Sequence, residues 1–269
     1  MSKKFLLIVE GKDTEKNIFE EVLSRYGYNV VDCDVIDITG KLKNFDMAKM
    51  VSDGDEVFIA QGPRNRIHDW LKLMDKKYDD FERFFEGING LFAGIFIIYD
   101  VDHNSTEDIS TMFEKYSDET TNGLLLLNSP CIEVVADAGR ESELKVCHLK
   151  EYKKSLNKRF SLSHNCSAKQ YIIDNFEELV LYYLDKNCEE LGCDNVIEHP
   201  SLILSKINTL NERVNYPKEE AYVYYRYFTT VMYVSIAFMK GLTKEIDNSN
   251  IVKSFFESHK IEKQLHKGI

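Results

Sequence analysis

Acidic side chains follow three apolar runs in this 269-residue chain, close to where each run ends. Glu10 comes directly after the run FLLIV, and Glu15 stands one short turn later. Asp100 and Asp102 follow the run IFIIY, and Glu133 lies a few residues beyond the run LLLL. Clustered carboxylates repel one another, and the usual resolution is a divalent cation with oxygen ligands, most often Mg²⁺. The pattern therefore predicts a site for Mg²⁺ or Mn²⁺.

The elements that must position these acids are typical of β/α units around a parallel sheet, because short apolar runs alternate with helical periodicity. The expected strands are residues 5–9, 28–38, 56–60, 94–99 and 123–127. Ile18, Phe19, Val22 and Leu23 recur at helical spacing between the first two. Open α/β sheets build their sites at the carboxyl ends of their strands, so we expect the acids to converge there.

Each of these acids also has a purely structural interpretation. A helix dipole alone favours an acid such as Glu15 in the first helical turn. Aspartates are common wherever a strand ends in a solvated loop. These interpretations do not account for acids after three separate apolar runs, or for the glycine directly after Glu10. Alternation along a strand also sends Asp100 and Asp102 to the same side, so that one ion can bind both.

The second half of the chain has a different character, because strand signals stop after about residue 140. Helical periodicity runs through residues 171–191, 202–214, 221–239 and 251–265. We therefore expect a sheet domain over residues 1–140 and an α-helical domain over residues 141–269. The run 221–239 is about long enough to cross a bilayer. It carries Arg226 and five tyrosines, however, so we expect a buried helix and no membrane span.

The distribution of charge also changes near residue 140. The formal net charge is −11, and residues 1–140 hold 16 Lys and Arg against 27 Asp and Glu. The segment 145–169 holds seven basic residues and Glu151 as its one acid. A solvated helix face is the common explanation of such a run, and binding of nucleic-acid phosphates is the alternative. The candidate nucleic-acid-binding residues are Lys150, Lys153, Lys154, Lys158 and Arg159.

Several other classes of function are not supported. The chain has no GxxxxGK[ST] loop, so it lacks that route to ATP hydrolysis. Cys188, Cys193 and His199 do not have the spacing of a zinc knuckle. Six cysteines in so long a chain give no disulfide framework, and the first residues have too few apolar side chains for a signal peptide. We therefore expect a cytoplasmic protein. A long helical pattern over residues 65–86 resembles a lid or insertion.

The segments EGKDTEKNIFEEVL, YDVDHN and NSPCIE resemble a known set of motifs in order and spacing. These are the Glu-Gly-x-x-Thr-Glu, Asp-x-Asp and Asn-Pro-Cys-Phe-Glu elements of RloB-like and OLD-like Toprim nucleases of bacterial phage defence. The resemblance covers residues 5 to about 135 and implies a Toprim-like sheet and a Mg²⁺-dependent nuclease. By position it implies that Glu10, Asp100 and Asp102 bind the metal and carry catalysis. Glu15 and Glu133 would complete or support the metal site.

The resemblance also implies partners. The substrate would be DNA or RNA, and the setting would be phage defence by abortive infection. An ATPase partner is expected, because OLD-like systems pair Toprim with an ATPase and this chain has no P-loop. A homodimer is compatible with the sequence. Two other functions stay open: a housekeeping Toprim nuclease that processes ribosomal RNA, and a non-catalytic Toprim module for binding or regulation.

Overall fold

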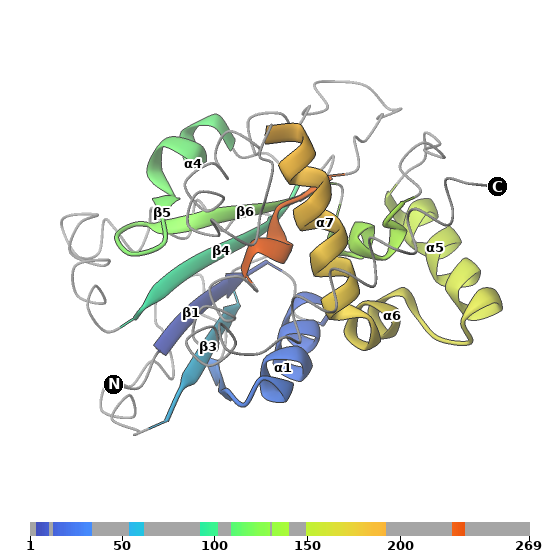
Figure 1. Cartoon of the computed structure of the whole chain (residues 1–269), viewed down its shortest axis with the longest axis horizontal. Helices are drawn as coiled ribbons and strands as arrows, with labels where there is room; N and C mark the ends of the chain where they lie inside the picture. Colours follow the sequence, from blue (N-terminus) through green and yellow to red (C-terminus); the bar gives the residue numbers. More distant parts are fainter. Residues whose placement is uncertain are drawn as a thin grey trace. The chain divides into compact units, whose positions relative to one another are not determined.

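The computed structural model of the chain describes residues 4–10, 13–33, 54–61, 92–101, 109–129, 131–139, 149–191 and 228–234 (Figure 1). The contacts within the chain group residues 1–233 into one compact unit and residues 234–269 into a second. The helices and strands of the described residues lie in the first unit. They confirm the predicted α/β class, with a mixed, mostly parallel sheet flanked by helices.

Some predictions concern residues outside these ranges. They are Asp102, residues 34–38 of the second expected strand, and the helical patterns of residues 65–86, 202–214 and 251–265. The predicted division into domains near residue 140 stays a prediction, as does the Toprim-like identity of the sheet.

Within the described ranges, the sheet has seven strands in the order β2-β3-β1-β4-β6-β5, with β7 also paired to β6. Their bounds are β1 (Lys4–Val9), β2 (Asn29–Cys33), β3 (Glu56–Gln61), β4 (Gly94–Asp100), β5 (Ser117–Asp118), β6 (Gly123–Ser129) and β7 (Phe228–Thr229). The pairs β2–β3, β3–β1, β1–β4 and β4–β6 are parallel. Strands β5 and β7 run antiparallel to β6. The five expected strands are therefore confirmed within the described residues.

Between their polar ends, the central strands are continuously apolar, as is typical of parallel strands that are covered on both faces. Leu7 of β1, Ile97 of β4 and Leu125 of β6 are fully buried. Gly123 opens β6 at φ +85°, in the left-handed region that favours glycine, and a Cβ there would lie 3.2 Å from the Ile97 side chain. Continuous burial of this kind fixes the strands, and with them the groups that follow their carboxyl ends.

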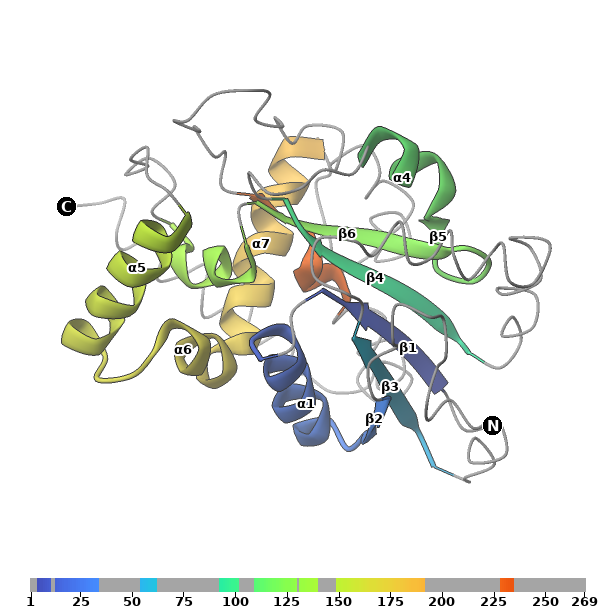
Figure 2. The same cartoon turned by 180° about the vertical axis from the view of Figure 1, so that it is seen from behind.

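Helices pack around this sheet (Figures 1 and 2). Their bounds are α1 (Glu15–Arg25), α4 (Ile109–Lys115), α5 (Leu149–Ser163), α6 (Ala168–Asp174) and α7 (Phe176–Leu191), with short 3-10 helices η2 (Ile132–Asp137) and η4 (Val231–Tyr233). Helix α1 is expected from its apolar spacing, and it buries that stripe. Figure 1 shows α7 crossing one face of the sheet with η4 beside it, and η4 contacts both α7 and β6.

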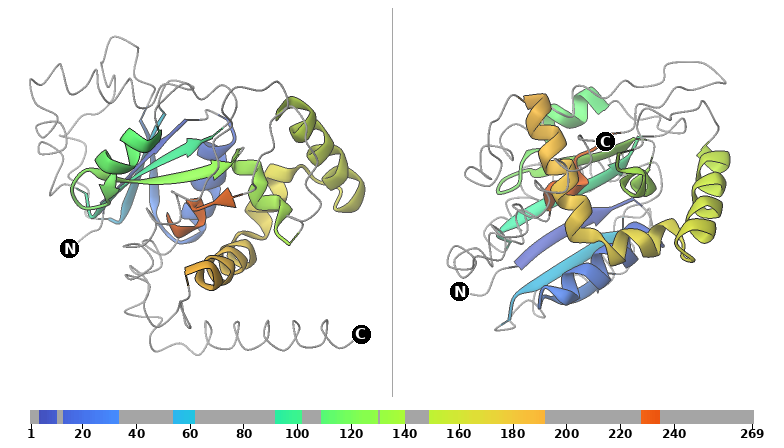
Figure 3. Two further views of the ribbon diagram at one scale, coloured as in Figure 1. Left: turned by 90° about the horizontal axis from the view of Figure 1, so that it is seen from above. Right: turned by 45° about the vertical axis from the view of Figure 1, so that its right-hand side comes forward.

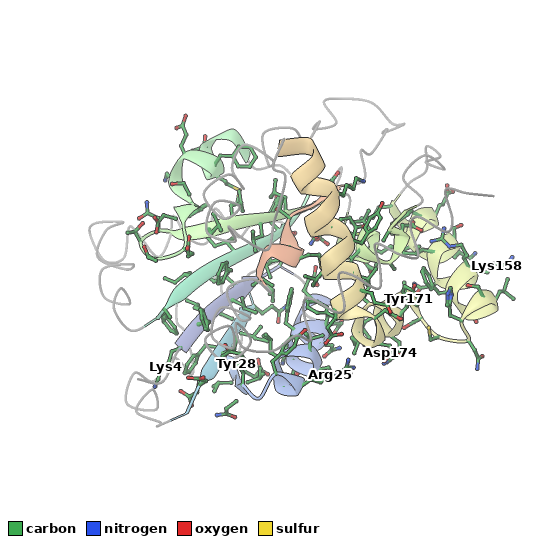
Figure 4. The ribbon with its side chains drawn as sticks, in the orientation of Figure 1. Lys4, Arg25, Tyr28, Lys158, Tyr171 and Asp174 are labelled. Carbon is green, nitrogen blue, oxygen red and sulfur yellow. The ribbon has the colours of Figure 1, made fainter. Side chains whose placement is uncertain are left out.

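Helices α5, α6 and α7 follow one another along one side of the unit (Figure 3). Helix α6 contacts α1, η2, α5 and α7, so it joins the helical segment to the first half of the chain. Arg25 at the end of α1 donates to the Ile173 carbonyl at 2.7 Å and lies 3.9 Å from Asp174. Figure 4 shows the Arg25 and Asp174 side chains side by side. No helix in the described ranges is long and apolar enough to span a membrane.

The prediction of one continuous helix over residues 221–239 is wrong for the part that the structure describes. Phe228 and Thr229 form β7 along the end of β6, and the 3-10 turn η4 follows. The Thr230 backbone N–H donates to the Leu127 carbonyl at 2.9 Å. Threonine and valine are stiff at Cβ and disfavour helix, and the outer edge of β6 offers backbone partners to an extended segment. Strand pairing therefore overrides the helical spacing here.

Candidate functional site

Carboxylates gather where the central strands end, as the sequence predicts. Glu10 directly follows β1, and Asp100 is the last residue of the neighbouring strand β4. The Asp100 backbone N–H donates to Glu10 Oε2 at 3.0 Å, which ties the two strand ends together. Glu15 comes from the first turn of α1 and Glu133 from η2. We call Glu10, Glu15, Asp100 and Glu133 the carboxylate cluster.

The members of the cluster share one electrostatic environment. Burial raises the pKa of Asp100 well above its usual range, and the charges of Glu15, Glu10 and Glu133 raise it further. Burial also raises the pKa of Glu15, opposed by hydrogen bonding to its own backbone N–H and increased by the charge of Glu133. Glu10, Glu15 and Glu133 are each at most 7% exposed. Negative charge is thus concentrated in a poorly solvated place, where a cation would be strongly favoured.

One ammonium of the chain already lies beside the cluster. Lys153 Nζ of α5 lies 3.1 Å from Glu133 Oε2, a charge contact rather than a directed hydrogen bond. Burial alone would lower the pKa of this ammonium, but its acidic neighbours, Glu133 and Asp100 among them, raise it above its usual range. Lys153 therefore stays charged at neutral pH. Among the described residues, the ammonium of Lys153 alone does not balance four carboxylates.

Glu133 is held in place by the helical segment. The Tyr183 hydroxyl of α7 donates to the Val134 carbonyl of η2 at 3.0 Å. Asp137 at the end of η2 accepts from the Tyr152 hydroxyl at 3.0 Å and pairs with the Arg159 guanidinium. Both partners of Asp137 come from α5, and Asp137 itself is only 3% exposed. The helices after residue 149 therefore fix the 3-10 turn that presents Glu133.

Asn128 is a buried polar neighbour of Asp100 that the sequence pattern does not single out as a site residue. Its Nδ2 donates to Asp100 Oδ1 at 2.9 Å, and its Oδ1 accepts from the Thr229 hydroxyl at 2.8 Å. Asn128 is fully buried and Thr229 is 1% exposed. The sequence does show an asparagine at the end of an apolar strand, but no local pattern indicates its partner in β7.

The structure brings together most of the predicted metal ligands. Glu10, Glu15, Asp100 and Glu133 meet at one edge of the sheet, and Asp102 lies outside the described residues. No three His, Cys, Asp or Glu side chains in the described ranges are arranged as a group that could hold a metal ion. The donor chemistry nevertheless fits a hard cation such as Mg²⁺, since every member of the cluster offers carboxylate oxygens.

The predicted nucleic-acid-binding residues separate into two groups on α5. Lys150, Lys154 and Lys158 are exposed and lie four residues apart, so they share one face of the helix. Lys153 and Arg159 are instead engaged with Glu133 and Asp137. We call the first group the α5 ridge, and Figure 4 shows its member Lys158 pointing away from the rest of the molecule.

Comparisons with known proteins assign the chain to no family. No family model, curated protein or solved structure matches the chain.

Proposed function

We propose that this chain is a Mg²⁺-dependent nuclease of Toprim type that hydrolyses phosphodiester bonds of DNA or RNA. The observation that carries the proposal is the meeting of Glu10, Glu15, Asp100 and Glu133, from four separate elements, at the carboxyl edge of the sheet. Burying like charges together opposes folding, so an arrangement of this kind is retained where a ligand of opposite charge uses it. The motif resemblance in the sequence supports the same function.

Glu10, Asp100 and Glu15, together with Asp102 and Glu133, would hold one or two Mg²⁺ ions. When bound, such an ion would supply the positive charge that polarises a scissile phosphate, activates water and stabilises the leaving oxygen. Glu10 is the residue that we assign to proton transfer. Lys153 holds Glu133 in the cluster and contributes positive charge at the place where a phosphate would approach.

The nucleic acid would run along the α5 ridge. Lys150, Lys154 and Lys158 are spaced about 6 Å apart along the helix axis, and Lys153, on the same helix, contacts the cluster. Exposed lysines on one helix face are suited to the sugar–phosphate backbone, which requires no particular sequence. The ridge therefore provides a basic track on the exposed face of the helix whose Lys153 contacts the cluster.

The biological setting that we propose is phage defence with an ATPase partner. The acidic balance of residues 1–140 disfavours non-specific binding of nucleic acid in the absence of metal. A partner that delivers the substrate would overcome this barrier. A housekeeping role in ribosomal-RNA processing uses the same chemistry, and a non-catalytic binding module uses the same cation site without turnover.

Incubation of the purified chain with nucleic acid tests this function. Supercoiled DNA and total tRNA are each treated with the chain, alone and with candidate ATPases, in Mg²⁺, Mn²⁺ or EDTA. We expect cleavage that requires the divalent ion and is lost in Asp100→Asn. The matched control is Asp174→Asn, which removes an exposed carboxylate at the end of α6 and should cleave like the wild type.

The outcomes separate the alternatives. Cleavage of RNA alone, without an ATPase, would favour RNA processing over defence. Mg²⁺-dependent stabilisation without cleavage of either substrate would favour the binding module. Cleavage that persists in Asp100→Asn, or in EDTA, would refute the proposed site.

A further inference from the structure

A short segment from the far end of the described chain is hydrogen-bonded to the carboxylate cluster. Thr229 of β7 pairs with Asn128 of β6 in the sheet register, although the two residues are 101 positions apart in sequence. The Thr229 hydroxyl donates to Asn128 Oδ1, and Asn128 Nδ2 donates to Asp100 Oδ1. Two buried polar side chains thus connect β7 to a cluster carboxylate.

The direction of these hydrogen bonds is set at the Asp100 end when that carboxylate is ionised, as it is with a bound cation. The Val231 backbone N–H, which can only donate, lies 3.2 Å from the Thr229 Oγ1 acceptor. This contact uses one lone pair of the hydroxyl oxygen, and the hydroxyl hydrogen is available to donate to Asn128 Oδ1. At the other end the Asp100 carboxylate can only accept when ionised, so it requires the amide nitrogen of Asn128. A flipped Asn128 amide would place two oxygens against each other.

We propose that Asn128 and Thr229 are positioning residues that hold the Asp100 carboxylate in one orientation for the bound cation. This inference rests on the proposed function, since it takes Asp100 as a cation ligand. Partners behind a metal ligand fix its orientation, and their loss commonly weakens metal binding about 10- to 100-fold. Asn128 and Thr229 are therefore part of the site, and β7 is more than a cover for the edge of β6.

The chain provides a matched control at the next residue. Thr230 is also fully buried, and its hydroxyl accepts from the Leu127 backbone N–H at 2.8 Å. Thr229 and Thr230 therefore both join this segment to β6 through a buried hydroxyl. The hydroxyl of Thr230 binds backbone, whereas that of Thr229 binds the asparagine that holds Asp100. Replacing either threonine by valine removes one hydroxyl with little change in volume.

Calorimetric titration of Mg²⁺ into the full chain tests the proposal, with the melting temperature of each variant measured alongside. Thr229→Val should weaken Mg²⁺ binding by about 10-fold or more. Thr230→Val should bind Mg²⁺ within about twofold of the wild type, even where its melting temperature falls equally. Thr229→Ser, which keeps the hydroxyl, should restore the wild-type affinity. If Thr229→Val does not fold, Thr229→Ala and Thr230→Ala replace the pair of valine variants.

The result that would overturn the proposal is equal Mg²⁺ affinity in the Thr229 and Thr230 variants. An affinity lost in Thr229→Val but not recovered in Thr229→Ser would also overturn it, because the hydroxyl would then not be the cause. Asp100→Asn is titrated in the same series. If it binds Mg²⁺ like the wild type, the metal site itself is wrong, and that failure is distinct from a failure of the positioning role.

Discussion

Buried acids are arranged differently at the two ends of the parallel sheet: one is paired with a base, and the others are grouped together. At the amino end, Glu56 of β3 is buried, and Lys4 of β1 lies 3.2 Å from it. The Asn29 amide of β2 also donates to Glu56, at 3.3 Å. This acid is thus paired with a base and also accepts from an amide. At the carboxyl ends of β1 and β4, the four carboxylates of the cluster lie with one ammonium among the described residues, that of Lys153.

This difference separates a structural charge from a candidate functional one. A balanced ion pair at the start of three strands helps to fix their register and needs no further ligand. An unbalanced cluster destabilises the folded state, and proteins tolerate such destabilisation mainly at sites of function. The carboxyl edge of the sheet is therefore where we expect a cation to bind.

The largest change in unfolding free energy should come from breaking the Lys4–Glu56 pair at the amino end of the sheet. Lys4→Met leaves Glu56 buried without its base, and removing one partner of a buried pair typically costs about 3–5 kcal/mol of unfolding free energy. Urea unfolding measures this loss, and the double change Lys4→Met with Glu56→Met should recover most of it. Mg²⁺-induced stabilisation should be unchanged in both. A loss below about 1 kcal/mol would mean that the pair behaves like a surface salt bridge.

At the carboxyl end of the sheet, by contrast, removing an acidic side chain should increase stability. At neutral pH, Asp100 costs free energy in the folded state, because its raised pKa means that it either carries a charge that its neighbours oppose or holds a proton that the unfolded chain has released. Asp100→Asn removes this cost, so the metal-free protein should become more stable. A gain of roughly 1 kcal/mol corresponds to about 2–4 °C in melting temperature for a unit of this size. The same variant should lose the rise in melting temperature that Mg²⁺ gives the wild type. Thermal melts in EDTA and in Mg²⁺ show both effects, and a fall in the EDTA melting temperature would contradict the comparison.

The pH dependence of stability should report the same imbalance. Because the pKa values of Asp100 and Glu15 are raised in the folded state, the native protein holds protons that the unfolded chain has released. These two groups therefore stabilise the fold at low pH. Their contribution is lost as pH rises from about 4 through their raised pKa values.

Melting temperatures across that range, in EDTA and in Mg²⁺, check the sign. The fall with rising pH should be smaller in Mg²⁺ and smaller in Asp100→Asn. A slope that is the same in the wild type and Asp100→Asn would show that other groups cause it.

The smallest effect on stability should come from the α5 ridge. Lys150, Lys154 and Lys158 changed together to Ala should alter the unfolding free energy by only about 0.5 kcal/mol, as is usual for exposed positions. Binding of nucleic acid should weaken similarly for all sequences. Its log–log salt slope should fall by about 0.7–0.9 for each phosphate that the variant no longer neutralises. Arg159→Ala is the contrasting variant, since it leaves Asp137 buried beside one fewer partner and should lower stability. An unchanged salt slope in the triple variant would place the nucleic acid elsewhere.

Much of the sheet could be predicted because buried parallel strands have continuous apolar sequences. The convergence of the acids follows from the same fact, since parallel strands end at one edge. The two-residue strands β5 and β7 could not be predicted, because a periodicity needs more residues than they have. The pairing of Thr229 with Asn128 depends on contacts between distant parts of the chain, which no local pattern contains.

Lys153 and Arg159 point toward η2, and their positions in the helical repeat of α5 already distinguish them from the other basic residues. Tyr152, Leu156 and Phe160 form the buried stripe of α5. Lys153 and Arg159 each stand three residues from Leu156, beside this stripe, whereas the α5 ridge lies farther round the helix. Helical spacing could therefore separate the two groups of basic residues. The identity of the carboxylates that receive them, on η2, required the structure.

Equilibrium binding of Mn²⁺ tests the central claim most directly. Electron paramagnetic resonance reports the free ion as the full chain is titrated. The carboxylate cluster predicts that the wild type removes Mn²⁺ from solution and that Mg²⁺ displaces it. It also predicts that Asp100→Asn and Glu10→Gln remove little, whereas Asp174→Asn binds like the wild type. Equal binding by the wild type, Asp100→Asn and Glu10→Gln would show that the ion binds elsewhere and would contradict the account.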